Sequence, residues 1–182
     1  IAALRIISSL VSLYIYRTND TIQQESFICE TIVPLGSQVQ VYLPDSSIVQ
    51  LNSGSVLRYN SAYNKSNRDI YLNGEGYFTV KKGQQIPFLV KAGDLNVKVL
   101  GTIFNVKAYE EDNKIEVGLI EGRVNVYTKN EYADNRILAP NQHLTYDKLT
   151  QQMHTTSIDA TSIYQWTKGI LYFNKSSLID IC

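Results

Sequence analysis

The sequence has few of the residues on which enzymes and metal proteins commonly depend. It contains two His, two Cys and one Trp in 182 residues. Neither His143 nor His154 lies in a paired metal-binding spacing, so no metal site is predicted. The nucleophile elbow, the phosphate loop and the glycine motif of dinucleotide-binding proteins are all missing. These absences predict no catalytic residue, no cofactor and no enzyme activity.

Charge of one sign is also missing, because 17 Lys and Arg face 17 Asp and Glu without a run of five like charges. A nucleic-acid-binding protein needs a basic stripe for the phosphates, so nucleic acid is not expected as a partner. Two cysteines, Cys29 and Cys182, are too few for a disulfide-stapled mini-domain or a zinc ribbon. The strand-like surroundings of Cys29 predict a small core residue rather than a nucleophile.

An apolar segment opens the sequence. Residues 1–16 contain twelve apolar residues, and the others are Arg5 and three Ser. A helix of this length spans about 24 Å, which is less than the ~30 Å core of a bilayer. Tyr14 and Tyr16 precede polar residues, as at a membrane interface. We expect residues 1–17 to be part of a transmembrane helix. A signal-peptide core and a buried amphipathic helix are the alternatives.

Alternation of apolar and polar residues dominates from Thr21 to Thr155. Clear runs lie at 39–43, 95–99 and 104–108, and turn signals such as Asn73-Gly74 recur every 8–12 residues. This pattern is typical of strands with one solvent-facing side. It predicts one all-β domain over residues 21–155, an antiparallel sandwich or rolled sheet of about ten to twelve short strands.

The pattern changes after Thr155. The sequence predicts a short helix at Ala160–Trp166, a strand at Ile170–Phe173 and the start of another helix at Ser176. A strand followed by part of a helix cannot bury its own apolar face. We therefore expect residues 160–182 to begin a small α+β domain that is truncated at Cys182.

Several polar residues have two interpretations. Glu110, Glu111 and Asp112 cluster at an expected hairpin tip. They suit a solvated turn, or a calcium site completed by another loop. His143 precedes Leu144 in an alternating run and is expected to face solvent. Thirteen Tyr would serve a sugar-stacking platform, or the faces of ordinary sheets.

Five blocks follow one another in a recognisable order. They are LPDSSIVQLNSGSVLRYN (43–60), RDIYLNGEGYFTV (68–80), PFLVKAG (87–93), VKVLGTIFNVKAY (97–109) and IEVGLIEGRVNVY (115–127). In order and spacing they resemble the periplasmic domain of the FecR family of transmembrane anti-sigma factors, in the version common in Bacteroidetes. The resemblance runs from about Gln38 to the end of the sequence. Its most specific piece is Val99-Leu100-Gly101-Thr102-x-Phe104-Asn105-Val106.

The sequence departs from the family pattern at two positions. Gly76 stands where Ala is usual, and Asn141 stands where Gly is usual in a Leu-x-Pro-Gly-Gln turn. Because Asn tolerates the left-handed backbone conformation, we expect the turn at Asn141 to survive.

The residues that carry the resemblance are expected to be structural. Gly101 would let the backbone bend between strands at 95–100 and 103–109. Thr102 and Asn105 would hydrogen-bond the backbone at that bend. Phe78, Phe88 and Phe104 suit a core. The family-motif residues are Gly74, Glu75, Phe78, Leu100, Gly101, Thr102, Phe104, Asn105, Glu121 and Gly122. A candidate partner-binding edge comprises Trp166, Gly169, Leu171 and Phe173.

The resemblance implies a signal relay. Such proteins hold an extracytoplasmic-function sigma factor through a cytoplasmic segment, cross the inner membrane once and place a receptor in the periplasm. The receptor contacts the signalling domain of a TonB-dependent outer-membrane transporter, and regulatory proteases then free the sigma factor. This implies membrane contact through residues 1–16 and a periplasmic location from about residue 20 onward. The cytoplasmic segment is absent from this sequence, so a sigma factor is a partner only through that missing segment.

Two other classes stay open. A cell-surface carbohydrate-binding β module would show an exposed aromatic row in a groove. A secreted hydrolase fragment would need acids clustered in a cleft, and the sequence shows no such cluster.

Overall fold

The computed structural model describes residues 27–129 and 135–169. The expected membrane segment at 1–17, the expected strand at Ile170–Phe173 and the helix expected from Ser176 lie outside these residues. Among the described residues, no helix is both long enough and apolar enough to cross a membrane.

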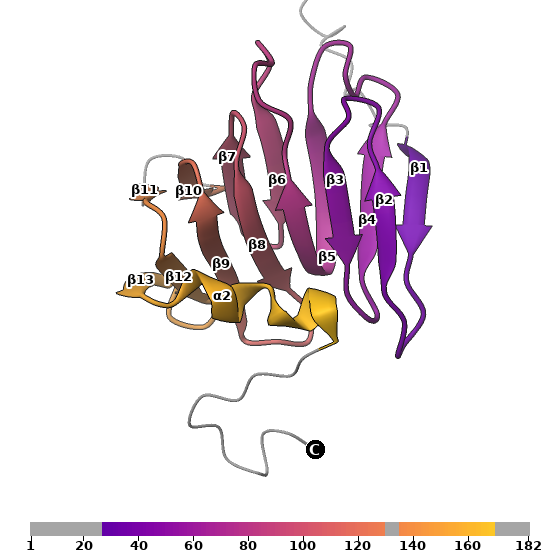
Figure 1. Cartoon of the computed structure of the whole chain (residues 1–182). Helices are drawn as coiled ribbons and strands as arrows, with labels where there is room; N and C mark the ends of the chain where they lie inside the picture. Colours follow the sequence, from indigo (N-terminus) through magenta and orange to yellow (C-terminus); the bar gives the residue numbers. More distant parts are fainter. Residues whose placement is uncertain (1–26, 130–134, 170–182) are drawn as a thin grey trace, which may run out of the picture.

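The described chain is built almost entirely of strands (Figure 1). The thirteen strands are β1 (Phe27–Ile32), β2 (Val39–Tyr42), β3 (Ile48–Leu51), β4 (Val56–Asn60), β5 (Asp69–Thr79), β6 (Phe88–Ala92), β7 (Leu95–Val99), β8 (Ile103–Ala108), β9 (Lys114–Glu121), β10 (Val124–Thr128), β11 (Asn135–Leu138), β12 (Gln142–Asp147) and β13 (Gln152–Ser157). The all-β prediction is confirmed, with slightly more strands than the ten to twelve expected.

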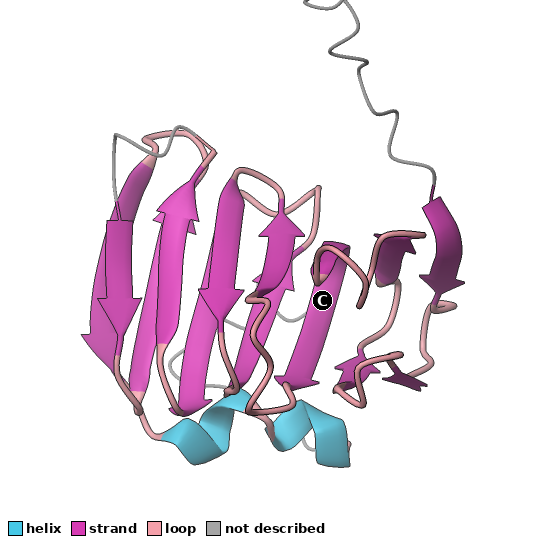
Figure 2. Ribbon diagram, turned by 90° about the horizontal axis from the view of Figure 1, so that it is seen from above, coloured by secondary structure: helices cyan, strands magenta, loops and turns pink. Residues whose placement is uncertain are grey.

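The strands form two layers that share β5 (Figure 2). Sheet A has the order β1-β4-β5-β6-β7-β10-β11, and sheet B has the order β2-β3-β5-β8-β9-β12-β13. Residues 69–73 of β5 pair with β4 and β6, whereas residues 74–79 pair with β3 and β8. The fold is therefore one continuous sheet that curls into a rolled sandwich, as expected.

The change of layer occurs at Gly74. Its φ angle is 114°, and a Cβ atom here would lie 2.6 Å from the Ser55 Cα atom. The Ser55 Oγ atom accepts the Glu75 N–H at 2.9 Å and donates to the Glu75 carbonyl at 3.1 Å. The pair Asn73-Gly74, expected as a turn, is instead the middle of an 11-residue strand. Glycine adopts positive φ easily, both in a tight turn and where a strand crosses between layers. The Asn-Gly pair alone therefore does not distinguish a turn from a crossing.

One strand pair runs parallel, which corrects the expectation of an entirely antiparallel sheet. β5 and β6 are parallel, with Asp69 opposite Leu89 and Leu72 opposite Ala92. A parallel pair needs a connection that brings the chain back to its starting edge. Here β5 ends in sheet B, and residues 80–87 return the chain to sheet A at the level where β5 began.

The core lies between the two sheets and confirms three predicted members. Phe78, Phe88 and Phe104 have no exposed surface. The rings of Phe78 and Phe104 stack at 4.9 Å, and Phe88 meets Phe78 edge-on at 6.2 Å. Full burial of one such side chain stabilises a fold by about 1.5–3 kcal/mol. The apolar positions of the alternating runs thus supply both inner faces.

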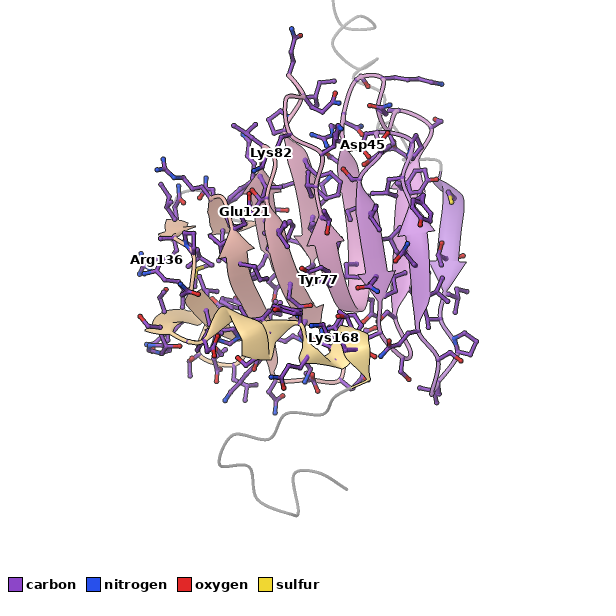
Figure 3. The ribbon with its side chains drawn as sticks, viewed as in Figure 1. Asp45, Tyr77, Lys82, Glu121, Arg136 and Lys168 are labelled. Carbon is purple, nitrogen blue, oxygen red and sulfur yellow. The ribbon has the colours of Figure 1, made fainter. Side chains whose placement is uncertain are left out.

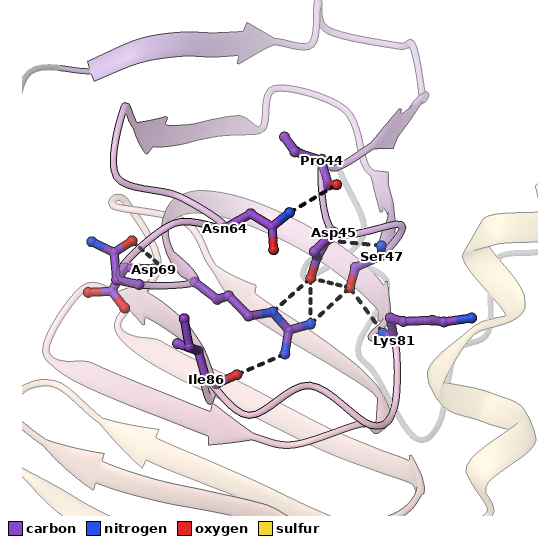
Figure 4. A network of polar contacts seen from close by, with 9 residues as sticks. Pro44, Asp45, Ser47, Asn64, Asp69, Lys81 and Ile86 are labelled. Atoms are coloured by element: carbon purple, nitrogen blue, oxygen red, sulfur yellow. Dashed lines mark hydrogen bonds and ion pairs between the residues drawn. The ribbon is translucent and has the colours of Figure 1, made fainter.

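An ion pair is sealed inside the same domain (Figure 4). The Arg68 Nε atom donates to Asp45 Oδ2 at 2.8 Å, and Arg68 Nη1 donates to the Ile86 carbonyl at 3.0 Å. Burial raises the pKa of Asp45, but hydrogen bonds from Ser47 and Arg68 outweigh it and hold that pKa below its ordinary value. The pair explains the Asp45 of the first motif block. Nothing in the local sequence pattern signals the role of Arg68.

After β13 the chain turns back onto the outer face of sheet B. Helix α2 (Ala160–Ile163) and the 3-10 helix η1 (Gln165–Lys168) form what we call the C-terminal segment, which agrees with the helix predicted at Ala160–Trp166. It crosses in front of β9 and β8 in Figure 1. The described part of the expected α+β domain therefore lies against the β domain. The domain boundary itself stays a prediction.

Candidate functional site

A polar network on the outer face of sheet B holds the C-terminal segment. The Trp166 Nε1 atom donates to Asn105 Oδ1 at 3.1 Å, and Asn105 Nδ2 donates to Glu75 Oε1 at 2.9 Å. The Asn52 Nδ2 atom donates to the other Glu75 oxygen at 2.8 Å. The Gln38 Nε2 atom donates to the Trp166 carbonyl at 3.0 Å. We call these five residues the seat network.

The register of the strands brings these side chains to one face. Tyr77 on β5 lies opposite Asn105 on β8, and Asn105 lies opposite Gly118 on β9. Side chains two residues apart on a strand share a face, so Glu75 points outward with Tyr77. The ring of Tyr77 lies 6.0 Å from the ring of Tyr164 in the C-terminal segment (Figure 3).

Gly118 makes room for the C-terminal segment. A Cβ atom at this position would lie 2.9 Å from Ile163 Cδ1, so glycine allows Ile163 to pack on the sheet. The segment thereby covers a face that would otherwise be open to water.

Glu75 is a carboxylate enclosed by this arrangement. Its burial raises its pKa, and hydrogen bonds from Asn52 and Asn105 only partly offset that effect. Ionisation of Glu75 therefore opposes the closed seat network. Because each carboxylate oxygen already accepts an amide hydrogen, Glu75 is built as a structural acceptor and not as a base for an outside substrate.

A histidine and a carboxylate lie close together beside the seat network. The His143 Nε2 atom is 3.6 Å from Glu116 Oε2, and the His143 side chain is only 22% exposed. A hydrogen bond from His143 lowers the pKa of Glu116, and burial opposes that shift. The predicted outward face of His143 is right, but its side chain is half-buried on that face and not fully exposed to solvent.

The most specific motif piece forms a junction at the other end of the molecule, near Lys82 and Glu121 in Figure 3. The buried Thr102 Oγ1 atom donates to the Arg123 carbonyl at 3.1 Å. The Thr102 carbonyl accepts the Val80 N–H at 3.0 Å. Thr102 therefore joins the β7–β8 connection to the β9–β10 connection and to the end of β5. We call this arrangement the turn junction.

Two features explain the glycine at position 101. Its φ angle of 159° lies at the edge of the range that L side chains rarely adopt, in line with the expected bend. A Cβ atom would also lie 2.7 Å from the Lys82 Cα atom. Gly122 has φ of 96°, inside the same range, and a Cβ atom there would lie 3.2 Å from the Gly101 carbonyl. Backbone conformation and close packing within the turn junction therefore both favour glycine at these two positions.

Asn105 corrects a second expectation. It was expected to bond the backbone at the bend, but its side chain reaches Glu75 and Trp166. Thr102 does bond the backbone, across to Arg123 and not within its own bend. Nothing in the local pattern signals the Asn105–Trp166 contact, since the two residues are 61 positions apart.

Two residues of the candidate partner edge fall within the described chain. Trp166 is half-buried in the seat network. Gly169 closes η1 with φ of 73° and donates its N–H to the Trp166 carbonyl at 2.9 Å. Leu171 and Phe173 lie outside the described residues. The described end of this edge is therefore engaged with sheet B.

Residues 27–129 and 135–169 bring together no group of three His, Cys, Asp or Glu side chains that would hold a metal ion. Cys29 is a half-buried free cysteine on the edge strand β1, not a core residue as expected. Between residues 29 and 169, leaving out 130–134, Tyr42 is the only aromatic side chain that is mostly exposed. This surface offers no aromatic row for a sugar.

Comparison with known protein families matches residues 30–125 to the FecR protein family. The chain belongs to the FecR family. Two crystal structures of a protein described as an anti-sigma factor, from Parabacteroides distasonis ATCC 8503, each share 33% sequence identity with it. The alignment with one of them has a TM-score of 0.77 and covers 84% of this chain and 70% of that structure's chain. The alignment with the other has a TM-score of 0.78 and covers 85% of this chain and 71% of that structure's chain. No curated protein matches the chain.

FecR proteins of the anti-sigma factor type are regulators and not enzymes, so this chain has an anti-sigma factor regulator role. The motif residues of this FecR chain serve separate parts of the fold. Glu75 and Asn105 are members of the seat network, and Leu100, Thr102 and Gly122 lie at the turn junction. Phe78 and Phe104 belong to the core, and Gly74 lies where β5 changes layer.

Proposed function

We propose that this FecR-family chain is the periplasmic receptor and signal relay of a membrane-anchored anti-sigma regulator. Residues 1–16 anchor it in the inner membrane, and residues from about 20 onward lie in the periplasm. It senses the signalling domain of a TonB-dependent outer-membrane transporter. It thereby controls the release of an extracytoplasmic-function sigma factor, which a cytoplasmic segment outside this sequence holds until regulatory proteases act.

The observation that supports this proposal is the seat network. It ties the chain that continues beyond Gly169 to sheet B through two hydrogen bonds of Trp166. Each such bond stabilises by about 0.5–1.5 kcal/mol, and the packing of Ile163 adds about 1–2 kcal/mol. A partner that binds with micromolar affinity supplies about 8 kcal/mol. A transporter that binds the released segment more tightly than the seated one, by only part of that energy, would lift the C-terminal segment off the sheet.

The first test measures where the transporter docks. The signalling domain of the transporter encoded beside this gene is pulled down with residues 21–155, with residues 21–182 and with a form extended through the following domain. We expect tight capture only by the extended form. Equal capture by residues 21–155 would place the docking site on the β domain and contradict this relay.

The second test measures signalling in cells. Trp166→Ala in the full-length parent protein should abolish induction of a sigma-dependent reporter by the transporter's ligand, while repression without ligand persists. Lys168→Ala is the matched control, because Lys168 is exposed and its Nζ atom lies 5.0 Å from the centre of the Tyr164 ring in its own segment. Normal induction in the Trp166→Ala strain would show that the seat network does not carry the signal.

A further inference from the structure

A recess opens on the sheet A side of the turn junction. Its volume is about 690 Å³, and its lining includes Pro87, Lys98, Leu100, Thr102 and Arg123. We propose that this recess docks an acidic, extended peptide segment of a partner protein. One bulky apolar side chain of the peptide would lie against Leu100, and a carboxylate would lie between Lys98 and Arg123.

The exposure of Leu100 is fixed by the backbone on either side of it. Leu100 is 61% exposed, although Val99 before it is 2% exposed and Thr102 after it is 2% exposed. Gly101 packs against the Lys82 backbone, and Thr102 is held by Arg123. The chain therefore cannot turn Leu100 inward without breaking the turn junction. Leu100 thereby supplies a fixed apolar wall of the recess, and ligand pockets are lined mainly by apolar side chains with a few polar groups beside them.

Two cations beside Leu100 have no acidic partner among the described residues. The exposed Lys82, which also borders the turn junction, is neutralised because it pairs with Glu121. Lys98 and Arg123 are both exposed, and neither side chain forms an ion pair with any residue of 27–129 or 135–169. A partner with a carboxylate would neutralise these two cations. The long-range attraction between opposite charges would also favour the encounter of the two molecules.

The register places the two cations together. Lys98 on β7 lies opposite Asn125 on β10, and Arg123 precedes Asn125 by two residues. Residues with this spacing are diagonal neighbours on one face, with Cα atoms about 7–8 Å apart. One carboxylate can therefore contact both cations, and guanidinium binds carboxylate through paired hydrogen bonds.

A peptide suits this recess better than a membrane surface. Recognition of anionic lipid usually depends on clusters of about four to eight basic residues. Two free cations beside an apolar hollow are too few for that. The recess volume lies within the range of about 300–1,000 Å³ that is usual for specific binding pockets.

The test measures fluorescence anisotropy of a fluorescein-labelled peptide, Gly-Asp-Glu-Leu-Asp-Gly, against the 182-residue chain. We expect saturable binding that weakens in 0.5 M salt. It should weaken at least about tenfold, equivalent to ~1.4 kcal/mol, in Lys98→Glu and in Arg123→Glu. Lys168→Glu lies at the other end of the molecule and should leave the affinity unchanged (Figure 3). A peptide with Ser for Leu should bind more weakly, because the apolar contact is lost.

Reversing the charges of both the protein and the peptide shows whether a variant that loses binding is still folded. The double variant Lys98→Glu/Arg123→Glu should bind a peptide with Lys in place of Asp and Glu, which wild type should not bind. Equal binding of the acidic and basic peptides to wild type would overturn the proposal. A second result would also overturn it. In that result wild type binds phosphatidylglycerol vesicles and not the acidic peptide, and each single variant abolishes the binding to vesicles.

Discussion

At the residue scale, the buried pair of Arg68 and Asp45 is where we expect a single substitution to lower the stability of the fold strongly. Both side chains are almost completely buried, at 1% and 0% exposure. Removal of one partner leaves a buried charge uncompensated, which typically destabilises by about 3–5 kcal/mol. We expect Arg68→Met to lower the free energy of unfolding by that amount in urea denaturation.

Two comparisons make this first prediction specific. Arg58→Met removes the exposed Arg58–Glu30 pair, with side chains 46% and 40% exposed, and should change stability by less than about 1 kcal/mol. The double variant Asp45→Asn/Arg68→Met should recover part of the loss. If Arg68→Met is no worse than Arg58→Met, the sealed pair does not hold the fold as described.

Glu75 makes a prediction about pH at the same scale. Its folded-state pKa lies above the ordinary value of 4.5, because burial opposes ionisation. The folded protein therefore binds more protons than the unfolded chain, and the contribution of Glu75 to stability falls as pH rises through the unfolded pKa toward the folded one. We expect the stability of wild type relative to Glu75→Gln to be greater at pH 4.5 than at pH 7.5. Urea midpoints of both proteins at both pH values check this, and the opposite trend would show that the amide donors dominate.

Asn105 links the residue to the C-terminal segment. Asn105→Ala removes hydrogen bonds to Glu75 and Trp166. It should destabilise the fold by about 1–3 kcal/mol, because half-buried polar groups lose their partners. Trp166 is the only Trp, so its emission should also shift to longer wavelength. Asn96→Ala, on the outer face of sheet A, is the control and should leave the emission unchanged. An unshifted spectrum for Asn105→Ala would contradict the seat network.

At the element scale, the prediction concerns the crossing of β5 between the sheets. Gly74→Ala forces a Cβ atom within 2.6 Å of the Ser55 Cα atom at a φ angle of 114°. Gly36→Ala is a matched control, since Gly36 also has positive φ, 76°, but nothing lies within 4 Å of its added Cβ atom. We expect Gly74→Ala to destabilise by about 1–3 kcal/mol more than Gly36→Ala, as judged by denaturant midpoints. Equal losses would mean that backbone strain alone accounts for both.

Much of the fold at this scale follows from local pattern. The alternation at 95–99 and 104–108 matches β7 and β8, and Asn141 has the predicted left-handed φ of 63°. The crossing at Gly74 could not be predicted, because Asn-Gly satisfies a turn and a sheet crossing equally well. The parallel β5–β6 pair depends on which layer each strand joins, and that is decided by long-range packing.

The candidate site shows the same division. Glu75, Asn105 and Trp166 could each be singled out from the sequence, but for separate reasons. Their common network joins residues 30 and 61 positions apart, and no periodicity spans such separations. Alternation shows only that Asn105 points away from Phe104. It cannot show that a later segment covers that outer face.

At the scale of the whole molecule, removal of the C-terminal segment tests how far the β domain stands alone. A chain that ends at Asp159 loses the Ile163 packing and both Trp166 hydrogen bonds. We expect it to keep its β-type circular dichroism but to unfold with roughly 2–5 kcal/mol less free energy. The matched control ends at Gly169 and should be as stable as the longer chain. If both truncated chains are equally stable, the segment only rests on the sheet.

The shared strand also determines how this molecule can transmit force. A sandwich of two separate sheets can slide or peel apart one layer at a time, but here β5 is a member of both layers. Neither layer can loosen without taking hydrogen bonds from the other, so the domain should yield only as a unit. A pulling force on the C-terminal segment that is too weak to unfold the β domain would therefore move that domain as one rigid body. Sheet A would move together with sheet B. With such a rigid body, the segment that detaches most easily, and not the sandwich, limits the force that passes from one end of the domain to the other.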